Sequence, residues 1–202
     1  LIDGNALAEG HAYFRIAGAA HSKDHRYLAY AVDTNGSEFC AVFLLDTSTG
    51  EISDTGIAQA SGGLEWSADS GSVLWVWLDD EHRPRKIFRH RIGAATQDTL
   101  LFEQPDLAYF LNISETQSGK FITISITDHE TAEVQLLDAA DLSAPPHLVA
   151  AREKEHDYSV EHHGDKLIIL TNSGGAEDYR IVEAPVADPS PSNWREIEPH
   201  RL

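Results

Sequence analysis

Residues 158–186 read YSVEHHGDKLIILTNSGGAEDYRIVEAPV, and this stretch decides how the rest of the chain is interpreted. Three short apolar or alternating runs, YSVEH, LIILTN and YRIVEAPV, are separated by HGDK and SGGAED, which are rich in Gly and Asp. Short runs bounded by such residues predict β-strands joined by turns. A fourth run, NWREIE, follows the turn ADPSPS, so residues 157–199 predict a unit of four antiparallel strands.

The same order of strands and turns occurs three more times upstream, in residues 11–58, 62–103 and 108–150. Equivalent turn positions between the first and second strands lie 45, 49 and 47 residues apart, at Asp24, Asp69, Ser118 and Asp165. A repeat of roughly 40–50 residues with four strands is typical of a β-propeller blade, whereas an immunoglobulin-like sandwich has no reason to repeat at this spacing. We therefore predict an all-β chain in which residues 1–202 form about four consecutive four-stranded antiparallel blades, part of a β-propeller domain.

The second strands support blades that stack face to face. SVLWVWLD and LIILTN are apolar on both faces, which predicts sheets covered on both sides, while the shorter and more polar fourth strands predict outer edges. If the four blades form an open arc, we expect the end sheets to expose apolar side chains and to favour self-association. The residues expected there are Tyr27, Leu28, Leu167 and Ile169. A closed small propeller remains open as an alternative.

Composition limits the partners of the chain. It has 33 acidic and 15 basic side chains and a formal net charge of -18, which argues against nucleic acid and anionic membranes and favours cationic ligands. No run approaches the roughly 18 apolar residues of a membrane span, and the N-terminus lacks a signal peptide's basic flank. The single cysteine, Cys40, permits no intrachain disulfide, and we expect a cytoplasmic location. The absence of Met, even at position 1, leads us to expect a piece of a longer chain.

The segment EHHGD, residues 161–165, could suggest a metal site or a catalytic centre. Adjacent histidines on a strand point to opposite faces, so His162 and His163 are poorly placed to share one metal, and Gly-Asp is ordinary turn chemistry. The other histidines show no H-x-E-x-H or Cys/His ligand spacing, and there is no G-x-S-x-G motif. The sequence thus predicts no metal, no cofactor and no catalytic residue in this chain.

Six longer phrases carry a family resemblance. They are DGNALAEGHAYF (residues 3–14), LAYAVDTNGSE (28–38), RPRKIFRHRIG (83–93), HETAEVQLLDA (129–139), EHHGDKLIILTN (161–172) and VEAPVADP (182–189). In this order and spacing, they resemble the β-propeller of the oligopeptidase B group in the prolyl oligopeptidase family of serine peptidases. The resemblance covers essentially the whole chain.

The resemblance implies a parent enzyme in which a seven-bladed propeller is paired with an α/β-hydrolase domain that supplies a Ser-Asp-His triad. It also implies that the parent cleaves short peptides after Arg or Lys and that the propeller filters substrates by size. The remaining blades and the catalytic domain are absent from these 202 residues. No triad residue, oxyanion donor or specificity carboxylate is therefore assigned to a position here.

Charged residues concentrate in one class of loop. In an up-and-down blade, the loops between the second and third strands lie on the same face as the links between blades, and here both are rich in charge. We single out Glu103, Asp106, Arg152 and Arg83 as candidates that contact the catalytic domain or line the route of basic peptides to it. For any one of these residues, the alternative is an ordinary solvated loop position.

Two functions stay open at this point. The first is a non-catalytic gating module of a serine oligopeptidase, whose partner is the catalytic domain of the same polypeptide. The second is a free-standing propeller-like binding protein without a peptidase partner. They differ in whether the reading frame continues into a G-x-S-x-G segment.

Overall fold

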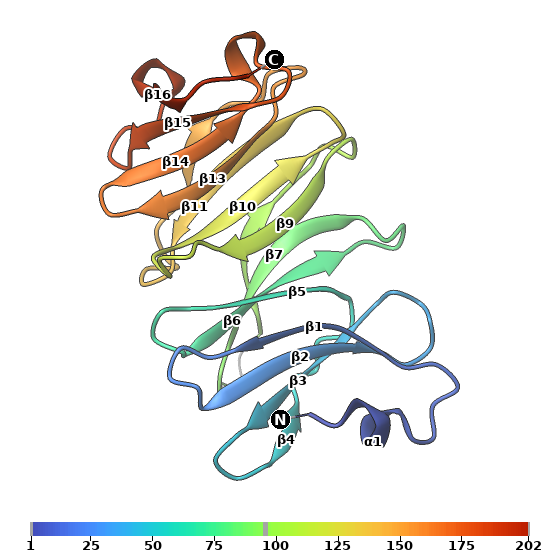
Figure 1. The fold of residues 1–202 in the computed structure, drawn as a ribbon. Coiled ribbons are helices and arrows are strands. Elements are labelled where there is room, and N and C mark those ends of the chain that lie inside the picture. The colour runs from blue at the N-terminus through green and yellow to red at the C-terminus, as the bar shows by residue number, and fades with distance from the viewer. Residues whose placement is uncertain (1, 95–96, 202) are drawn as a thin grey trace. The chain divides into compact units, whose positions relative to one another are not determined.

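The computed structural model describes residues 2–94 and 97–201. The chain divides into two units, Leu1–Leu107 and Ala108–Leu202. In the described residues, each unit contains two antiparallel sheets of four strands, and the strands of every sheet follow each other in sequence order (Figure 1). The predicted all-β architecture of four-stranded blades is confirmed.

The first unit begins with a short helix, α1 (Gly4–Ala8), which the sequence did not predict; the Asp3 side chain caps it by accepting the N–H groups of Asn5 and Ala6. Sheet 1 then contains β1 (Arg15–His21), β2 (Tyr27–Asp33), β3 (Ala41–Asp46) and β4 (Ile52–Asp54). Sheet 2 contains β5 (Ala60–Trp66), β6 (Ser72–Leu78), β7 (Pro84–Arg91) and β8 (Thr99–Glu103). Its first strand starts two residues before the expected blade of residues 62–103.

The second unit repeats this order. Sheet 3 contains β9 (Phe110–Glu115), β10 (Phe121–Thr127), β11 (Ala132–Asp138) and β12 (His147–Ala150). Sheet 4 contains β13 (Tyr158–His163), β14 (Lys166–Thr171), β15 (Arg180–Pro185) and β16 (Arg195–Glu198). Two short 3₁₀ helices flank β15, namely η1 (Ser173–Gly175) and η2 (Pro191–Asn193).

The turns between first and second strands share one device in sheets 1 to 3. A hydroxyl at the end of the first strand accepts a hydrogen bond of 2.9–3.2 Å from the N–H of the residue five positions later, and these hydroxyls belong to Ser22, Ser67 and Thr116. In the first two turns, the same hydroxyl donates to Asp24 or Asp69 at 2.6 Å. The repeat seen in the sequence is therefore a repeat of turn chemistry.

Sheet 4 replaces this device with a tight hairpin at EHHGD. His163 pairs with Lys166, and Gly164 takes a φ of 64°, a left-handed conformation that glycine adopts at little cost. His162 is buried, and its Nδ1 lies 2.8 Å from Ser118 Oγ in sheet 3, while His163 is exposed. The interpretation of EHHGD as a turn, with its two histidines on opposite faces, is confirmed.

The core of the first unit lies between sheets 1 and 2, where the innermost strands β1 and β5 approach backbone to backbone. A Cβ atom added at Gly18 would lie 2.0 Å from the Gly62 carbonyl oxygen. Around this contact pack side chains from both sheets, including Ala31, Leu64 and Trp66. Glycine at position 18 is thus what permits this close packing of the sheets.

The sequence-based prediction named the wrong residues for the exposed faces of the end sheets. Leu167 and Ile169 are fully buried against sheet 3, because alternation along β14 turns them inward and leaves Leu170 44% exposed instead. LIILTN is therefore not covered on both faces, unlike SVLWVWLD, whose strand β6 is almost wholly buried.

In sheet 1, Leu28 is buried because the N-terminal segment, through Leu7 and Phe14, packs on the face of the sheet that Leu28 shares with Tyr30 and Val32. Tyr27 is half-buried and stacks on Trp66, with ring centroids 6.3 Å apart.

Candidate functional site

Several acidic residues of the charged loops have a structural role, because they follow second strands and cap the next loop. Asp33, at the end of β2, accepts the N–H groups of the four residues 35–38. Burial by itself would raise the pKa of Asp33, but these four donors hold it below its usual value. Asp79 and Asp128 each accept two backbone N–H groups in the same way. These three carboxylates shape the loops that carry the charged residues.

Three of the four candidate residues lie around the segment of residues 103–107, which begins at the last residue of β8. Arg83 donates from Nη1 to the Leu107 carbonyl at 2.7 Å. Its neighbour on β7, Arg85, donates from Nε to the Gln104 carbonyl at 2.7 Å and from Nη2 to the Pro105 carbonyl at 2.9 Å. Two guanidinium groups thus bind the main chain of this segment.

Two of the candidate residues, Glu103 and Asp106, are the acidic residues of this segment. Glu103, at the end of β8, is exposed, and its carboxylate lies 3.5 Å from Lys86 Nζ. The Asp106 N–H donates to the side chain of buried Gln104 at 2.9 Å, which fixes the backbone at the start of the exposed turn. The structure therefore brings Arg83, Glu103 and Asp106 into one region of the first unit.

Arg152 belongs to the second unit and follows β12. Its Nε donates to Glu133 at 3.2 Å, and its guanidinium carbon lies 4.3 Å from the centre of the Tyr109 ring. Arg152 is thus tied to β11 and to the segment before β9, within its own sheet.

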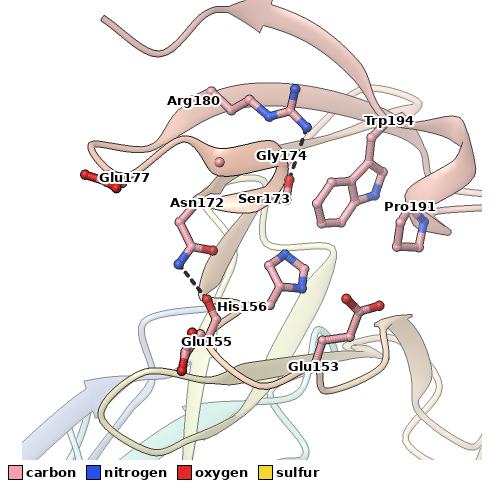
Figure 2. A pocket seen from close by; sticks show the side chains of 11 residues that line it. Glu153, Glu155, His156, Asn172, Ser173, Gly174, Glu177, Arg180, Pro191 and Trp194 are labelled. Atoms are coloured by element: carbon pink, nitrogen blue, oxygen red, sulfur yellow. Dashed lines mark hydrogen bonds between the residues drawn. The ribbon is translucent and has the colours of Figure 1, made fainter. Parts of the chain in front are cut away.

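A cavity of about 610 Å³ opens in the second unit, and no sequence motif indicates it. Its walls come from the link between β12 and β13, from η1 with the start of β15, and from the connection between β15 and β16 (Figure 2). We call it the His156 cavity; its lining includes Glu153, Glu155, His156, Glu177, Arg180 and Trp194. The successive pairing of β13, β14, β15 and β16 brings together residues that are distant in sequence, and no short sequence motif predicts such a group.

His156 is the most buried of these side chains, at 9% exposure. Its Nε2 lies 3.0 Å from Thr171 Oγ1, and its ring centroid lies 5.8 Å from that of Trp194. Burial lowers the pKa of His156, although Glu153 and Asp157 oppose the effect, and the lowered pKa favours the neutral ring. Within residues 2–94 and 97–201, its Nδ1 has no hydrogen-bond partner.

In the described residues, no group of three or more His, Cys, Asp or Glu side chains is arranged to hold a metal ion. Nor does that part of the chain contain a helix with the length and apolar character needed to cross a membrane.

Comparison with known proteins identifies the family. Residues 1–202 match the family model described as prolyl oligopeptidase, N-terminal beta-propeller domain. The chain is 32% identical over 203 residues to dipeptidyl aminopeptidase BI of Pseudoxanthomonas mexicana, an alignment that covers 100% of this chain and 28% of that protein. It is also 32% identical over 191 residues to protease 2 of Moraxella lacunata, with 93% of this chain and 28% of that protein covered.

Solved structures agree with the sequence relatives. Oligopeptidase B from Leishmania major matches with a TM-score of 0.91 and 28% identity, over 99% of this chain and 28% of that one. Oligopeptidase B from Trypanosoma brucei, in a closed form with covalently bound antipain, gives a TM-score of 0.87 at 27% identity, over 99% of this chain and 28% of that one. The chain spans little more than a quarter of these relatives, and over its whole length it belongs to the prolyl oligopeptidase family as part of the N-terminal β-propeller domain.

Proposed function

We propose that this chain is a non-catalytic propeller segment of a serine oligopeptidase and that it controls how peptides reach a catalytic domain on the same polypeptide. Family membership supports the peptidase context. The observation that carries the gating role is the segment of residues 103–107, whose main chain is held by Arg83 and Arg85 while Glu103 stays exposed. Acidic groups fixed in this way can attract cationic peptides or pair with a neighbouring domain.

Cleavage after Arg or Lys is the finer part of the proposal. The net charge of -18 supports it, because an acidic field raises the local concentration of basic peptides. The names of the relatives include a dipeptidyl aminopeptidase as well as oligopeptidase B, so specificity needs its own test. A cytoplasmic location is also proposed, and the single buried cysteine, Cys40, is compatible with it.

The test uses the longer protein that contains this chain. Replacing both acids, Glu103→Gln with Asp106→Asn, should raise KM for a basic peptide by roughly two- to five-fold at low salt, as expected for exposed charges. The effect should shrink at high ionic strength, where such charges are screened. A neutral peptide of equal length should show no change.

A matched control removes two exposed acids with Glu51→Gln, between β3 and β4, and Asp165→Asn, between β13 and β14. These turns lie at the end of each sheet opposite to its loop between the second and third strands. This variant has the same net charge as the first, so an equal rise in KM would show a general charge effect and contradict a specific role for residues 103–107. An unchanged KM in the first variant, with an unchanged melting temperature, would show that its two carboxylates are merely solvated.

A further inference from the structure

We propose that the His156 cavity binds the side chain of a basic residue of a peptide. In this site His156 and Glu153 accept hydrogen bonds from the cationic group, and Trp194 covers it. The proposed function gives this cavity no role, so the inference goes beyond it. Its test measures binding to this chain and requires no peptidase activity.

The first observation is the unsatisfied nitrogen of His156. The side chain is more than nine-tenths buried and forms part of the cavity wall, yet its Nδ1 has no partner among the described residues. An unpaired polar atom at a buried position costs free energy, which a ligand that supplies the missing partner would recover. Glu153, beside it at the cavity edge, is exposed, so its side chain can move to admit a ligand.

The tautomer of His156 determines which partner is missing. The Thr171 hydroxyl oxygen already accepts the N–H of Ser173 at 3.1 Å, and it has a second lone pair available for a donor. With the imidazole proton on Nε2, the ring donates to this oxygen at 3.0 Å, and Nδ1 becomes an acceptor. The ligand group that fits Nδ1 is then an N–H donor.

The charge of the cavity selects a cationic donor. Glu153, Glu155 and Glu177 line it, against one guanidinium, Arg180. The charge of Arg180 is already balanced by Glu196 at 3.3 Å, and that of Glu155 by Lys154 at 3.0 Å. Glu153 and Glu177 leave the cavity net negative, which favours an ammonium or guanidinium group.

Aromatic cover adds to this preference. Figure 2 shows the Glu153 carboxylate and the Trp194 ring on the same side of the His156 ring, within the cavity. A cation placed between the carboxylate and the indole face gains an ion pair and a cation–π contact together. These three residues therefore form the core of the proposed site.

Arg180 indicates that the ligand is part of a peptide. Its terminal nitrogens donate to Ser173 and Glu196, but its Nε is buried without an acceptor in the described part of the chain. A peptide residue has a carbonyl oxygen next to its side chain, and that oxygen is the acceptor Nε requires. A simple amine would satisfy Nδ1 of His156 alone.

The experiment titrates the ¹⁵N-labelled protein with three probes while the indole N–H resonance of Trp194 is followed by NMR. N-acetyl-arginine amide should shift this resonance saturably, and agmatine, which lacks the carbonyl groups, should bind more weakly. N-acetyl-citrulline amide, which lacks the charge, should bind at least about ten-fold more weakly, because a charge-assisted contact is lost. The resonance of Trp66, in the first unit, should not move.

Variants and the tautomer complete the test. Glu153→Gln should weaken binding of the arginine probe several-fold, while Glu130→Gln, an exposed loop acid outside the cavity, should not. The inference is overturned if the arginine and citrulline probes bind equally, if no saturable shift occurs, or if both variants have the same effect. It is also overturned if ¹⁵N shifts place the imidazole proton on Nδ1. None of these results bears on residues 103–107, so they leave the proposed function standing.

Discussion

Tyr158 and Ala150, in neighbouring sheets of the second unit, exchange two hydrogen bonds through a single hydroxyl group. Tyr158 Oη accepts the N–H of Ala150 at 3.1 Å and donates to the Ala150 carbonyl at 2.7 Å. It also accepts the N–H of Val134 at 2.8 Å, where the pairing of β11 with β12 changes register. A side chain from sheet 4 thus satisfies main-chain groups that the irregular pairing in sheet 3 leaves open.

This relationship predicts a large effect of removing one oxygen atom. Tyr158→Phe leaves buried main-chain groups without partners, so the free energy of unfolding should fall by roughly 2–4 kcal/mol. Urea denaturation measures this change. The control is Tyr13→Phe, at an exposed tyrosine, which should change stability by less than about 0.5 kcal/mol. Equal stabilities of the two variants would show that water replaces the Tyr158 hydroxyl at no cost.

A second prediction concerns the contact between β1 and β5. Gly18→Ala places a methyl group where the Gly62 carbonyl oxygen lies, at a separation of 2.0 Å, so the two strands must move apart. We expect a loss of about 1–3 kcal/mol in the free energy of unfolding and a lower melting temperature. In contrast, Gly4→Ala, in α1, approaches only Ile16 Cδ1 at 3.5 Å and should be neutral or slightly stabilising. A Gly18→Ala variant as stable as the wild type would contradict this.

The sequence predicted the blades because their signals are local. Each strand and each turn is specified by residues that lie within a few positions of one another along the chain. The alternation within strands and the recurring turns at Asp24, Asp69, Ser118 and Asp165 therefore suffice to count and bound the sheets. Which face of an end strand is covered depends instead on partners distant in sequence. Alternation alone could not show that Leu170, and not Ile169, is the exposed residue.

The candidate sites show the same difference between features that local sequence predicts and features that depend on residues distant in sequence. That Asp33 caps a loop could have been read from DTNG, since an Asp before Asn-Gly commonly accepts backbone N–H groups. Arg83 was selected for its charge alone, but its hydrogen bond to the Leu107 carbonyl became visible only in three dimensions. The cavity at His156 and Trp194 is assembled by strand pairing, and no spacing rule predicts it.

A third prediction follows from the Asp33 loop and depends on pH. The pKa of Asp33 is lowered in the folded state, so its stabilising effect is present above the unfolded-state pKa of about 3.9 and is lost as pH falls through the folded pKa. In the wild type, Oδ1 of Asp33 accepts the N–H of Gly36 and Oδ2 accepts the N–H of Glu38. Asp33→Asn also replaces one of these two oxygens with an NH₂ group, which cannot accept a hydrogen bond from an N–H. We expect this variant to be about 1–3 kcal/mol less stable at pH 7, and the difference from wild type to shrink below about pH 4.

The measurement is urea unfolding of both proteins across this pH range. Asp80→Asn, at an exposed acid in the equivalent loop of sheet 2, is the control and should follow the wild type throughout. A stability difference for Asp33→Asn that stays constant from neutral to acid pH would mean that the carboxylate charge is not what the loop requires.

The last prediction concerns self-association and moves the expected surface to the residues that the structure exposes. Leu170 is 44% exposed on β14, and its cross-strand partner Ile181 is half-buried, so together they form an apolar strip on sheet 4. Apolar side chains grouped on a sheet face favour association, and we expect this chain to form dimers or larger species at micromolar concentrations. Leu170→Glu should shift the population toward monomer, as measured by sedimentation velocity, because association would then bury a charge.

Leu100→Glu is the control, because it adds the same charge at an exposed leucine on β8. A shift of equal size would indicate that net repulsion, not the strip on sheet 4, controls association. A wild-type chain that stays monomeric over the whole concentration range would contradict the prediction directly.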